Sequence, residues 1–242
     1  GRLDRKVLLP WRSPPTVTTG KRGMATWLHG YWFWDWSDQR HSVEPIDVDN
    51  RIISVRSPYH GYGYRQGQCF YAFNLLSEMD QPSKWYLDRQ SGILYFHPPS
   101  ESGTTIVPVT LNAVSLEDVK QVSFENLTVK AFRADAIRLQ NCSHNRIVGC
   151  TIRNVGSWAL QVKGGTDNRV IGCEITQTGG GDRPKLKSAG HLSDSNYIHH
   201  YSRWKRMYQP AISINGVGHN RVTHNLIHHA RIWPSDLAAT NT

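Results

Sequence analysis

The chain of 242 residues has few cysteines, few acidic residues and no long apolar run. Its four cysteines form no Cys-x-x-Cys pair, which excludes a zinc ribbon and leaves the redox compartment undetermined. No stretch approaches the ~18 consecutive apolar residues of a membrane span, so we expect none. Residues 1–23 lack both a methionine and an apolar signal core, so either a signal has been removed or the chain is a fragment. The 38% of apolar residues predicts a folded core.

Basic residues are in excess, with 28 Lys and Arg against 19 Asp and Glu and a formal net charge of +9. This charge favours an acidic polysaccharide, a nucleic acid or another anionic surface as partner, although a solvated basic surface explains it equally well. The sequence has no zinc-finger spacing, no ribonucleoprotein motif and no helix-turn-helix pattern. We therefore expect no nucleic-acid partner.

An internal repeat dominates the second half. The segment 145–152 (NRIVGCTI) recurs as segment 168–175 (NRVIGCEI), and more loosely as segment 220–227. Each copy alternates apolar and polar residues and is rich in β-branched ones, which predicts a short strand. Short strands repeating without helices describe a solenoid. One frame position runs through the repeat in steps of 23, 23, 23 and 29, at Leu127, Cys150, Cys173, Asn196 and Asn225.

A second strand per coil is expected over residues 136–139 and 159–162, and over residues 211–214, which follow at the combined step of 52. The frame residues should stack at roughly 4.8 Å, the spacing of strands in a sheet. Asparagines can hydrogen-bond along such a stack, and Cys150 and Cys173 would fill the core, a structural rather than a redox role.

Two coils depart from the repeat. A Gly-rich excursion over residues 178–190 stands where a second strand is due, and the next coil is longer than the others, with its extra length around positions 201–208. Regular coils form the scaffold, whereas excursions from them carry chemistry.

The first half predicts a mixed, mainly β subdomain. Residues 27–40 hold four of the nine tryptophans, which would form either a sugar-stacking platform or a compact core. Residues 51–55 predict a strand, residues 71–79 have helical spacing, and residues 85–96 predict a hairpin that turns at Gly92. Such a subdomain would cap the solenoid, whose first coil otherwise exposes an unpaired edge.

A family resemblance rests on several of these segments. Residues 85–98 (WYLDRQSGILYFHP) resemble a signature of bacterial right-handed parallel β-helix repeat proteins, and residues 29–36 and 74–76 are similar to their N-terminal segment. The resemblance extends over residues 27–230 and implies an exported, carbohydrate-active protein related to glycoside hydrolases or polysaccharide lyases. Family members continue with further coils, so we expect a chain truncated at its C-terminus. Segments similar to the family's active-face coils are residues 181–183, 203–204, 208–211, 216–218 and 224–228.

The expected fold class is therefore all-β, a right-handed parallel β-helix with an N-terminal cap. We divide the chain into a basic segment (1–24), a Trp-rich capping subdomain (25–110), β-helix coils (111–230) and an irregular tail (231–242).

Carboxylates are the first catalytic candidates. Glycoside hydrolysis uses two of them, about 5–5.5 Å apart for retention and about 6.5–9.5 Å apart for inversion. Asp182 leads because it lies in the Gly-rich excursion, beside Arg183 in the family's Gly-Asp-Arg motif, although a turn-forming aspartate is the alternative. Asp194 is the second choice, and Asp167 and Glu174 are weaker.

The histidines form two pairs at equivalent positions of successive coils. Because neighbours in a strand face opposite ways, we expect His199 to stack on His228 and His200 on His229, with one stack facing outward. That stack can supply a general base, for which His228 is the candidate, or bind substrate hydroxyls. Histidines that merely line a turn are the alternative. A metal site with His224 is not expected, because the spacing fixes no third ligand.

A sugar subsite is expected near the second excursion, where Arg203 offers a hydrogen-bonding fork and Trp204 a stacking ring. A lyase would instead remove the proton α to a uronate carboxylate with Arg or Lys, and the basic rim of both excursions suits an acidic polymer. The candidate substrate-binding residues are Arg183, Arg203, Trp204, Tyr208, His199, His200 and His229.

We expect a carbohydrate-active protein that hydrolyses a polysaccharide by a carboxylate acid/base mechanism. A polysaccharide lyase acting on a uronate polymer and a non-catalytic carbohydrate-binding solenoid are the alternatives. No cofactor is expected, except calcium in a lyase. The expected protein is a monomer that is secreted, periplasmic or at the cell surface, and its partner is a polysaccharide or oligosaccharide.

Overall fold

The computed structural model describes residues 26–47, 49–50, 52–99, 103–180, 189–204, 210–213 and 218–230, and the backbone of residues 6–8. The chain forms two compact units, Gly1–Thr104 and Thr105–Thr242. Strands make up the regular structure of these residues, apart from the single 3-10 turn η1 (Leu76–Glu78). No helix among them is long and apolar enough to cross a membrane.

The first unit is built on an antiparallel sheet in the order β3 (Asp38–Ser42), β2 (Trp27–Tyr31) and β5 (Phe70–Phe73). The short strands β1 (Lys6–Leu8) and β4 (Ile52–Ser54) pair antiparallel, as do β6 (Trp85–Leu87) and β7 (Leu94–Phe96). The predicted strand and hairpin are thus confirmed. Gly92 in the hairpin turn has a φ of 75°, which a residue without a Cβ adopts freely.

The prediction of a helix over residues 71–79 is wrong. Residues 70–73 form β5, which pairs with β2, and only η1 follows. Asn74 has a left-handed φ of 59°, so the backbone turns directly after the strand. The aromatic side chains of Phe70, Tyr71 and Phe73 favour a strand once a partner strand is available, and this pairing overrides the helical spacing.

The tryptophan cluster divides between core and surface. Trp32 is buried in the core of the first unit with Leu28 and Val55. Trp34 and Trp36 lie in the following loop and are 41% and 37% exposed. The core interpretation is therefore confirmed for Trp32, and the sugar-stacking interpretation stays a prediction for the exposed members.

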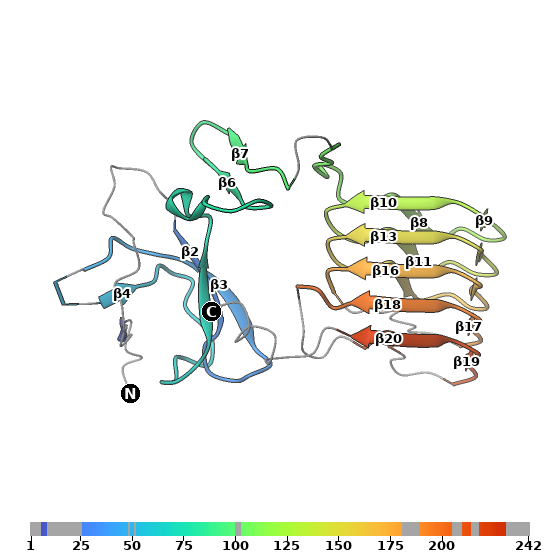
Figure 1. The fold of residues 1–242 in the computed structure, drawn as a ribbon. Helices are drawn as coiled ribbons and strands as arrows, with labels where there is room; N and C mark the ends of the chain where they lie inside the picture. The colour runs from blue at the N-terminus through green and yellow to red at the C-terminus, as the bar shows by residue number, and fades with distance from the viewer. Residues whose placement is uncertain are drawn as a thin grey trace. The chain divides into compact units, whose positions relative to one another are not determined.

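The second unit is a solenoid of three parallel sheets (Figure 1). The first sheet contains β8 (Val114–Glu117), β11 (Ile137–Gln140) and β14 (Leu160–Lys163). The second contains β9 (Ser123–Glu125), β12 (Arg146–Val148), β15 (Arg169–Ile171), β17 (Leu192–Asp194) and β19 (Arg221–Thr223). The third contains β10 (Thr128–Phe132), β13 (Thr151–Val155), β16 (Glu174–Thr178), β18 (Tyr197–Tyr201) and β20 (Leu226–Ala230).

The register of these sheets follows the sequence repeat. Ile152 pairs with Ile175 exactly one regular period later, and Ile198 pairs with Ile227 across the longer coil. Inward-pointing apolar side chains of successive coils form one continuous buried cluster. The all-β solenoid and its repeating frame are therefore confirmed.

The predicted stack forms inside the solenoid from Cys150 to Asn225, whereas Leu127 in the first coil is 47% exposed and does not fill the core. Cys150 and Cys173 are buried free thiols, in agreement with a structural role. Asn196 Oδ1 accepts the backbone N–H of Cys173 at 2.9 Å, and Asn196 Nδ2 donates to Asn225 Oδ1 at 2.8 Å. Each amide thereby satisfies buried polar groups of the neighbouring coil.

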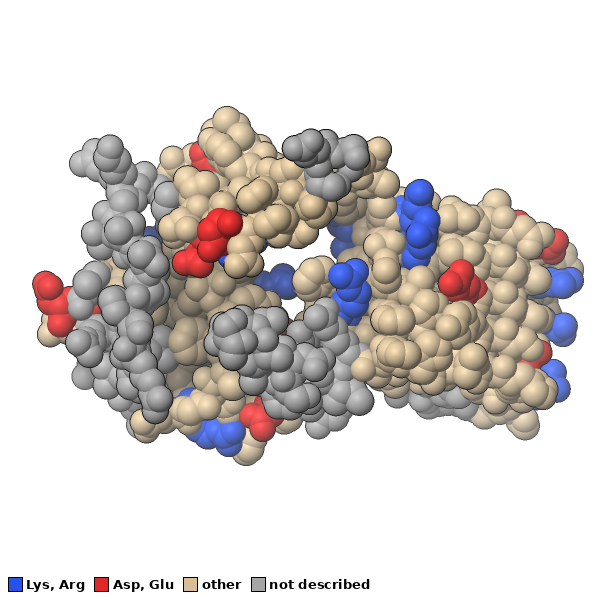
Figure 2. Space-filling view, viewed as in Figure 1, with Lys and Arg blue, Asp and Glu red and all other residues tan. Residues whose placement is uncertain are grey.

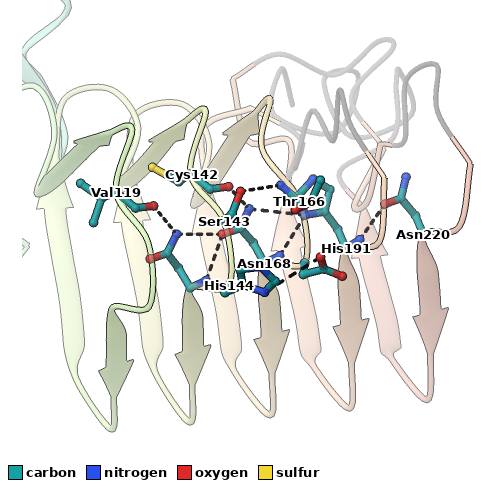
Figure 3. A network of polar contacts seen from close by, with 10 residues as sticks. Val119, Cys142, Ser143, His144, Thr166, Asn168, His191 and Asn220 are labelled. Atoms are coloured by element: carbon teal, nitrogen blue, oxygen red, sulfur yellow. Dashed lines mark hydrogen bonds and ion pairs between the residues drawn. The ribbon is translucent and has the colours of Figure 1, made fainter.

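A second internal ladder was missed by the sequence analysis. It runs through Asn145, Asn168, His191 and Asn220 (Figure 3). His191 Nδ1 accepts the backbone N–H of Asn168 at 3.2 Å, and the backbone N–H of His191 donates to Asn220 Oδ1 at 2.9 Å. Burial lowers the pKa of His191, although Asp167 opposes this shift. A neutral imidazole thus occupies a position that asparagine fills in the other coils.

The strand predicted over residues 211–214 is absent from residues 211–213, the part of it that the structure describes. Ala211 is nevertheless buried in the solenoid core. The chain reaches this position through bends instead of a paired strand. Most of the two predicted excursions, residues 181–188 and 205–209, lies outside the described residues.

Candidate functional site

The candidate site lies on the outward face of the third sheet, over β16, β18 and β20. In β18, Ile198 and Tyr201 point inward and are buried, whereas His199 is partly exposed and His200 exposed. Two neighbouring histidines therefore face outward, and the prediction that they face opposite ways is wrong. The reason is the left-handed φ of 51° at His200, which interrupts the alternation of the strand.

This left-handed residue recurs in every coil of the third sheet. Ala131, Asn154, Gln177 and His229 occupy the equivalent positions and have φ between 52° and 64°. The extra outward side chain is thus a property of the fold, and in β18 and β20 this side chain is a histidine.

Both predicted histidine stacks form. The rings of His199 and His228 lie 5.5 Å apart at 20°, and those of His200 and His229 lie 4.6 Å apart at 11°. Both stacks face outward, rather than one. We name these four side chains the histidine cluster.

Two hydrogen-bonded chains run through the histidine cluster. In the first, Glu174 Oε1 lies 3.3 Å from His199 Nε2, and His199 Nδ1 lies 2.7 Å from His200 Nδ1. In the second, Tyr197 Oη lies 2.9 Å from His228 Nε2, and His228 Nδ1 contacts His229 Nδ1. Each chain begins on the preceding strand, β16 or β18. Each links an ionisable oxygen to two imidazoles and can pass a proton along them.

Two imidazoles of the histidine cluster, His200 and His228, have a lowered pKa. Burial lowers the pKa of His200, and His229, His199 and Arg203 lower it further. Burial also lowers the pKa of His228, with contributions from His229, His199 and His200. Close imidazoles cannot all carry a charge, so at neutral pH the cluster can accept a proton.

Arg203 and Trp204, the residues of the predicted sugar subsite, follow β18. The Arg203 guanidinium carbon is 5.6 Å from the centre of the Trp204 ring, which is 54% exposed. Two backbone hydrogen bonds to the preceding coil hold this segment, from Arg203 N to Thr178 O (3.1 Å) and from Trp204 N to Gly179 O (2.8 Å). The structure thus places a cation whose charge acts on His200 and, beside that cation, an open aromatic ring.

Charge is graded along this face. Figure 2 shows basic side chains over β10 and β13 and an acidic one over β16. On these strands Lys130 and Arg153 are exposed and pair in register, and Glu174 lies in β16. A chain of anionic sugars laid along the sheet would meet cations beyond Glu174.

A family model for the right-handed beta helix region matches residues 102–233, more than half of the chain. The chain belongs to the right-handed β-helix family. No curated protein and no solved structure matches it. For this β-helix protein the family accounts for the solenoid, and the chemistry has to be derived from the histidine cluster and its neighbours.

Asp194 forms its hydrogen bonds with residues outside the histidine cluster. It belongs to β17 of the second sheet and accepts hydrogen bonds from Thr223 Oγ1 (2.7 Å) and His224 Nδ1 (2.9 Å). These two bonds lower the pKa of Asp194, Thr223 contributing most. His224 is therefore engaged here, and the described residues contain no group of three or more His, Cys, Asp or Glu that could hold a metal ion.

Three predicted site residues, Asp182, Arg183 and Tyr208, lie outside the described residues. Within the described part of the chain, Glu174 is the carboxylate that contacts the histidine cluster. Tyr197 was missed, and Glu174 was ranked too low. The signal available in the sequence is their shared register, since Glu174 and Tyr197 pair directly, one strand before each histidine pair.

Proposed function

We propose that this β-helix protein is a polysaccharide lyase that cleaves a uronate-containing polymer by β-elimination. The carrying observation is His200, an imidazole of lowered pKa, beside the cation Arg203. Removal of a proton α to a carboxylate needs a neutral base next to a positive charge, because that charge stabilises the developing carbanion.

The described side chains supply each step of this reaction. Arg203 binds the uronate carboxylate and Trp204 stacks on the sugar ring. His200 takes the α-proton, and the Glu174–His199 chain stabilises the resulting imidazolium. The electron pair of the broken C–H bond forms the double bond as the C–O bond to the next sugar breaks, and the leaving oxygen takes the proton of Tyr197. A proton from solvent restores Tyr197 through His228, and His200 releases the α-proton to solvent after the product leaves. This assigns the base to a histidine rather than to the Arg or Lys expected from sequence.

Hydrolysis is the second candidate, because the Glu174 carboxylate contacts the histidine cluster. It requires a second carboxylate, for which Asp182 was the sequence candidate. The two reactions differ in product. Elimination leaves an unsaturated sugar that absorbs in the ultraviolet, and hydrolysis leaves a reducing end without this absorbance.

The test is incubation with uronate polymers (polygalacturonate, alginate, glucuronoxylan) and with neutral xylan and β-glucan. We expect ultraviolet absorbance to rise with a uronate polymer only. Reducing ends without absorbance would assign the chain to the hydrolases and overturn the elimination.

The matched variants are His200→Ala and His144→Ala. His144 is also exposed and left-handed, with a φ of 58°, but lies outside the histidine cluster. Loss of a general base lowers the rate by about 10²–10⁴-fold, so we expect this loss in the first variant and wild-type activity in the second. Equal activities of the two would remove His200 from the mechanism.

A further inference from the structure

The first unit exposes three large aromatic side chains in two neighbouring loops. Trp34 and Trp36 follow β2, and Tyr62 lies in the loop before β5; they are 41%, 37% and 53% exposed. We name these three rings the aromatic platform. Exposed aromatic groups that cluster mark binding surfaces, because each leaves apolar area in water until a ligand covers it.

The two loops are held together without a ligand. The rings of Trp36 and Tyr62 pack edge to face, with their centroids 5.4 Å apart. Ser37 Oγ lies 3.1 Å from His60 Nε2, and His60 Nδ1 donates to Gly63 O at 3.1 Å. Because a carbonyl can only accept, this bond fixes the His60 tautomer, and Nε2 accepts the Ser37 hydroxyl proton. A platform assembled beforehand binds with a smaller loss of conformational entropy.

Polar groups border the aromatic platform. The Arg65 guanidinium carbon lies 5.9 Å from the ring centres of both Phe33 and Trp34, and Arg65 Nη2 lies 3.5 Å from Asp35 Oδ1. Both charged side chains remain about half exposed or more. A planar donor fork and an acceptor thus stand at the margin of the apolar rings.

This combination matches a pyranose ring, which has an apolar face of C–H groups and a rim of hydroxyls. The rings would stack on the sugar face, and Arg65 and Asp35 would bind hydroxyls at the rim. The Asp35 carboxylate offsets the Arg65 charge, so a polyphosphate chain finds no net cation here. We propose that the aromatic platform is a carbohydrate-binding site in the first unit, separate from the histidine cluster.

The proposal rests on the proposed function only for its ligand class, and binding can be measured without turnover. The protein is run in native gels that contain one soluble polysaccharide of the panel above. Its tryptophan fluorescence is then titrated with each polymer that retards it. We expect retardation of the full chain by at least one polymer. The Trp34→Ala/Trp36→Ala variant should bind about tenfold or more weakly.

The matched control is Trp85→Ala. Trp85 is 55% exposed on the hairpin of the same unit and should leave binding unchanged. Arg65→Met, which keeps the stem over Trp34, should weaken binding even if the double variant folds poorly. Binding retained by both platform variants, equal loss in Trp85→Ala, or no retardation by any polymer would overturn the proposal. Because His200→Ala leaves the platform intact, it should bind normally even if no cleavage is found.

Discussion

Single residues in this solenoid take unusual surroundings that only the three-dimensional register explains. His191 is an example, since it occupies an asparagine position of the inner ladder and accepts a backbone N–H there. An imidazole does so only in its neutral form with Nδ1 unprotonated. The folded state therefore resists protonation of this residue, in agreement with the lowered pKa of His191.

We predict that His191→Asn makes folding less sensitive to acid. Above the unfolded-state pKa of about 6.5, His191 is neutral in both states and stability does not change with its titration. As pH falls below that value, the unfolded chain binds the proton more readily than the folded one, so stability falls. Between about pH 7.5 and pH 5, the melting temperature of the variant should therefore drop a few degrees less than that of the original chain. Thermal unfolding by circular dichroism measures this, with the exposed His144→Asn as control. Equal slopes for both variants would show that the ladder does not need a neutral His191.

At the level of elements, the coils stack so closely that some positions admit no side chain. A Cβ on Gly156 would lie 2.1 Å from Arg133 O, and one on Gly179 would lie 2.1 Å from Gly156 O and 2.3 Å from Trp204 Cδ1. These glycines follow the strands of the third sheet one coil apart. The close approach that they allow also places Trp204 in the site.

Gly179→Ala should consequently destabilise the solenoid and displace Trp204. Overpacking of this kind costs about 1–3 kcal/mol, and relief requires backbone movement in both neighbouring coils. Denaturant unfolding measures the first effect, and quenching of tryptophan fluorescence by a soluble quencher reports the second. Gly218→Ala is the control, because nothing lies within 4 Å of its added Cβ. A stable Gly179→Ala with unchanged quenching would contradict the close contact.

The elements also explain which features the sequence predicts. The strands of the second half could be predicted because the sequence repeat and the pairing register have the same period. The histidine stacks could be predicted from the longer step between the last two coils. The outward direction of both His199 and His200 does not, because a left-handed φ leaves no mark on residue type. Glu174 reaches His199 diagonally from the adjacent strand, two positions away from the residue that pairs with His199, so the contact depends on side-chain reach as well as on register. The strand β5 replaces the expected helix because its partner β2 lies far away in the sequence, where a local pattern cannot reveal it.

Among the described strands of the second unit, each pairs only with strands of the neighbouring coils. Stability in such a solenoid is a sum of coil and interface terms, so the cost of a substitution depends on its place in the stack. Ile175 lies between two coils and is 2% exposed, whereas Ile227 in the last described strand is 41% exposed.

We predict that Ile175→Ala costs about 2–5 kcal/mol, the usual loss for a buried isoleucine, and that Ile227→Ala costs less than half as much. The two residues occupy the same register position, so the comparison isolates the effect of burial. Chemical denaturation followed by far-ultraviolet circular dichroism gives both values. Equal losses would show that the last coil is as well packed as the interior.

Because the left-handed residue recurs in every coil of the third sheet, equivalent outward positions can carry different side chains. Coils of this sheet display an adjacent pair of outward side chains at equivalent positions, filled by Lys130 and Ala131, by Arg153 and Asn154, and later by the histidines. In the coil between them Gln177 is exposed, whereas Thr176 is buried and its Oγ1 lies 3.2 Å from His199 Nδ1. Because the fold constrains the backbone of the left-handed residue and not its side chain, Gln177→His would extend the row of His200 and His229 by one coil without altering the core. The outer surface of this architecture can therefore change one coil at a time while the scaffold stays the same.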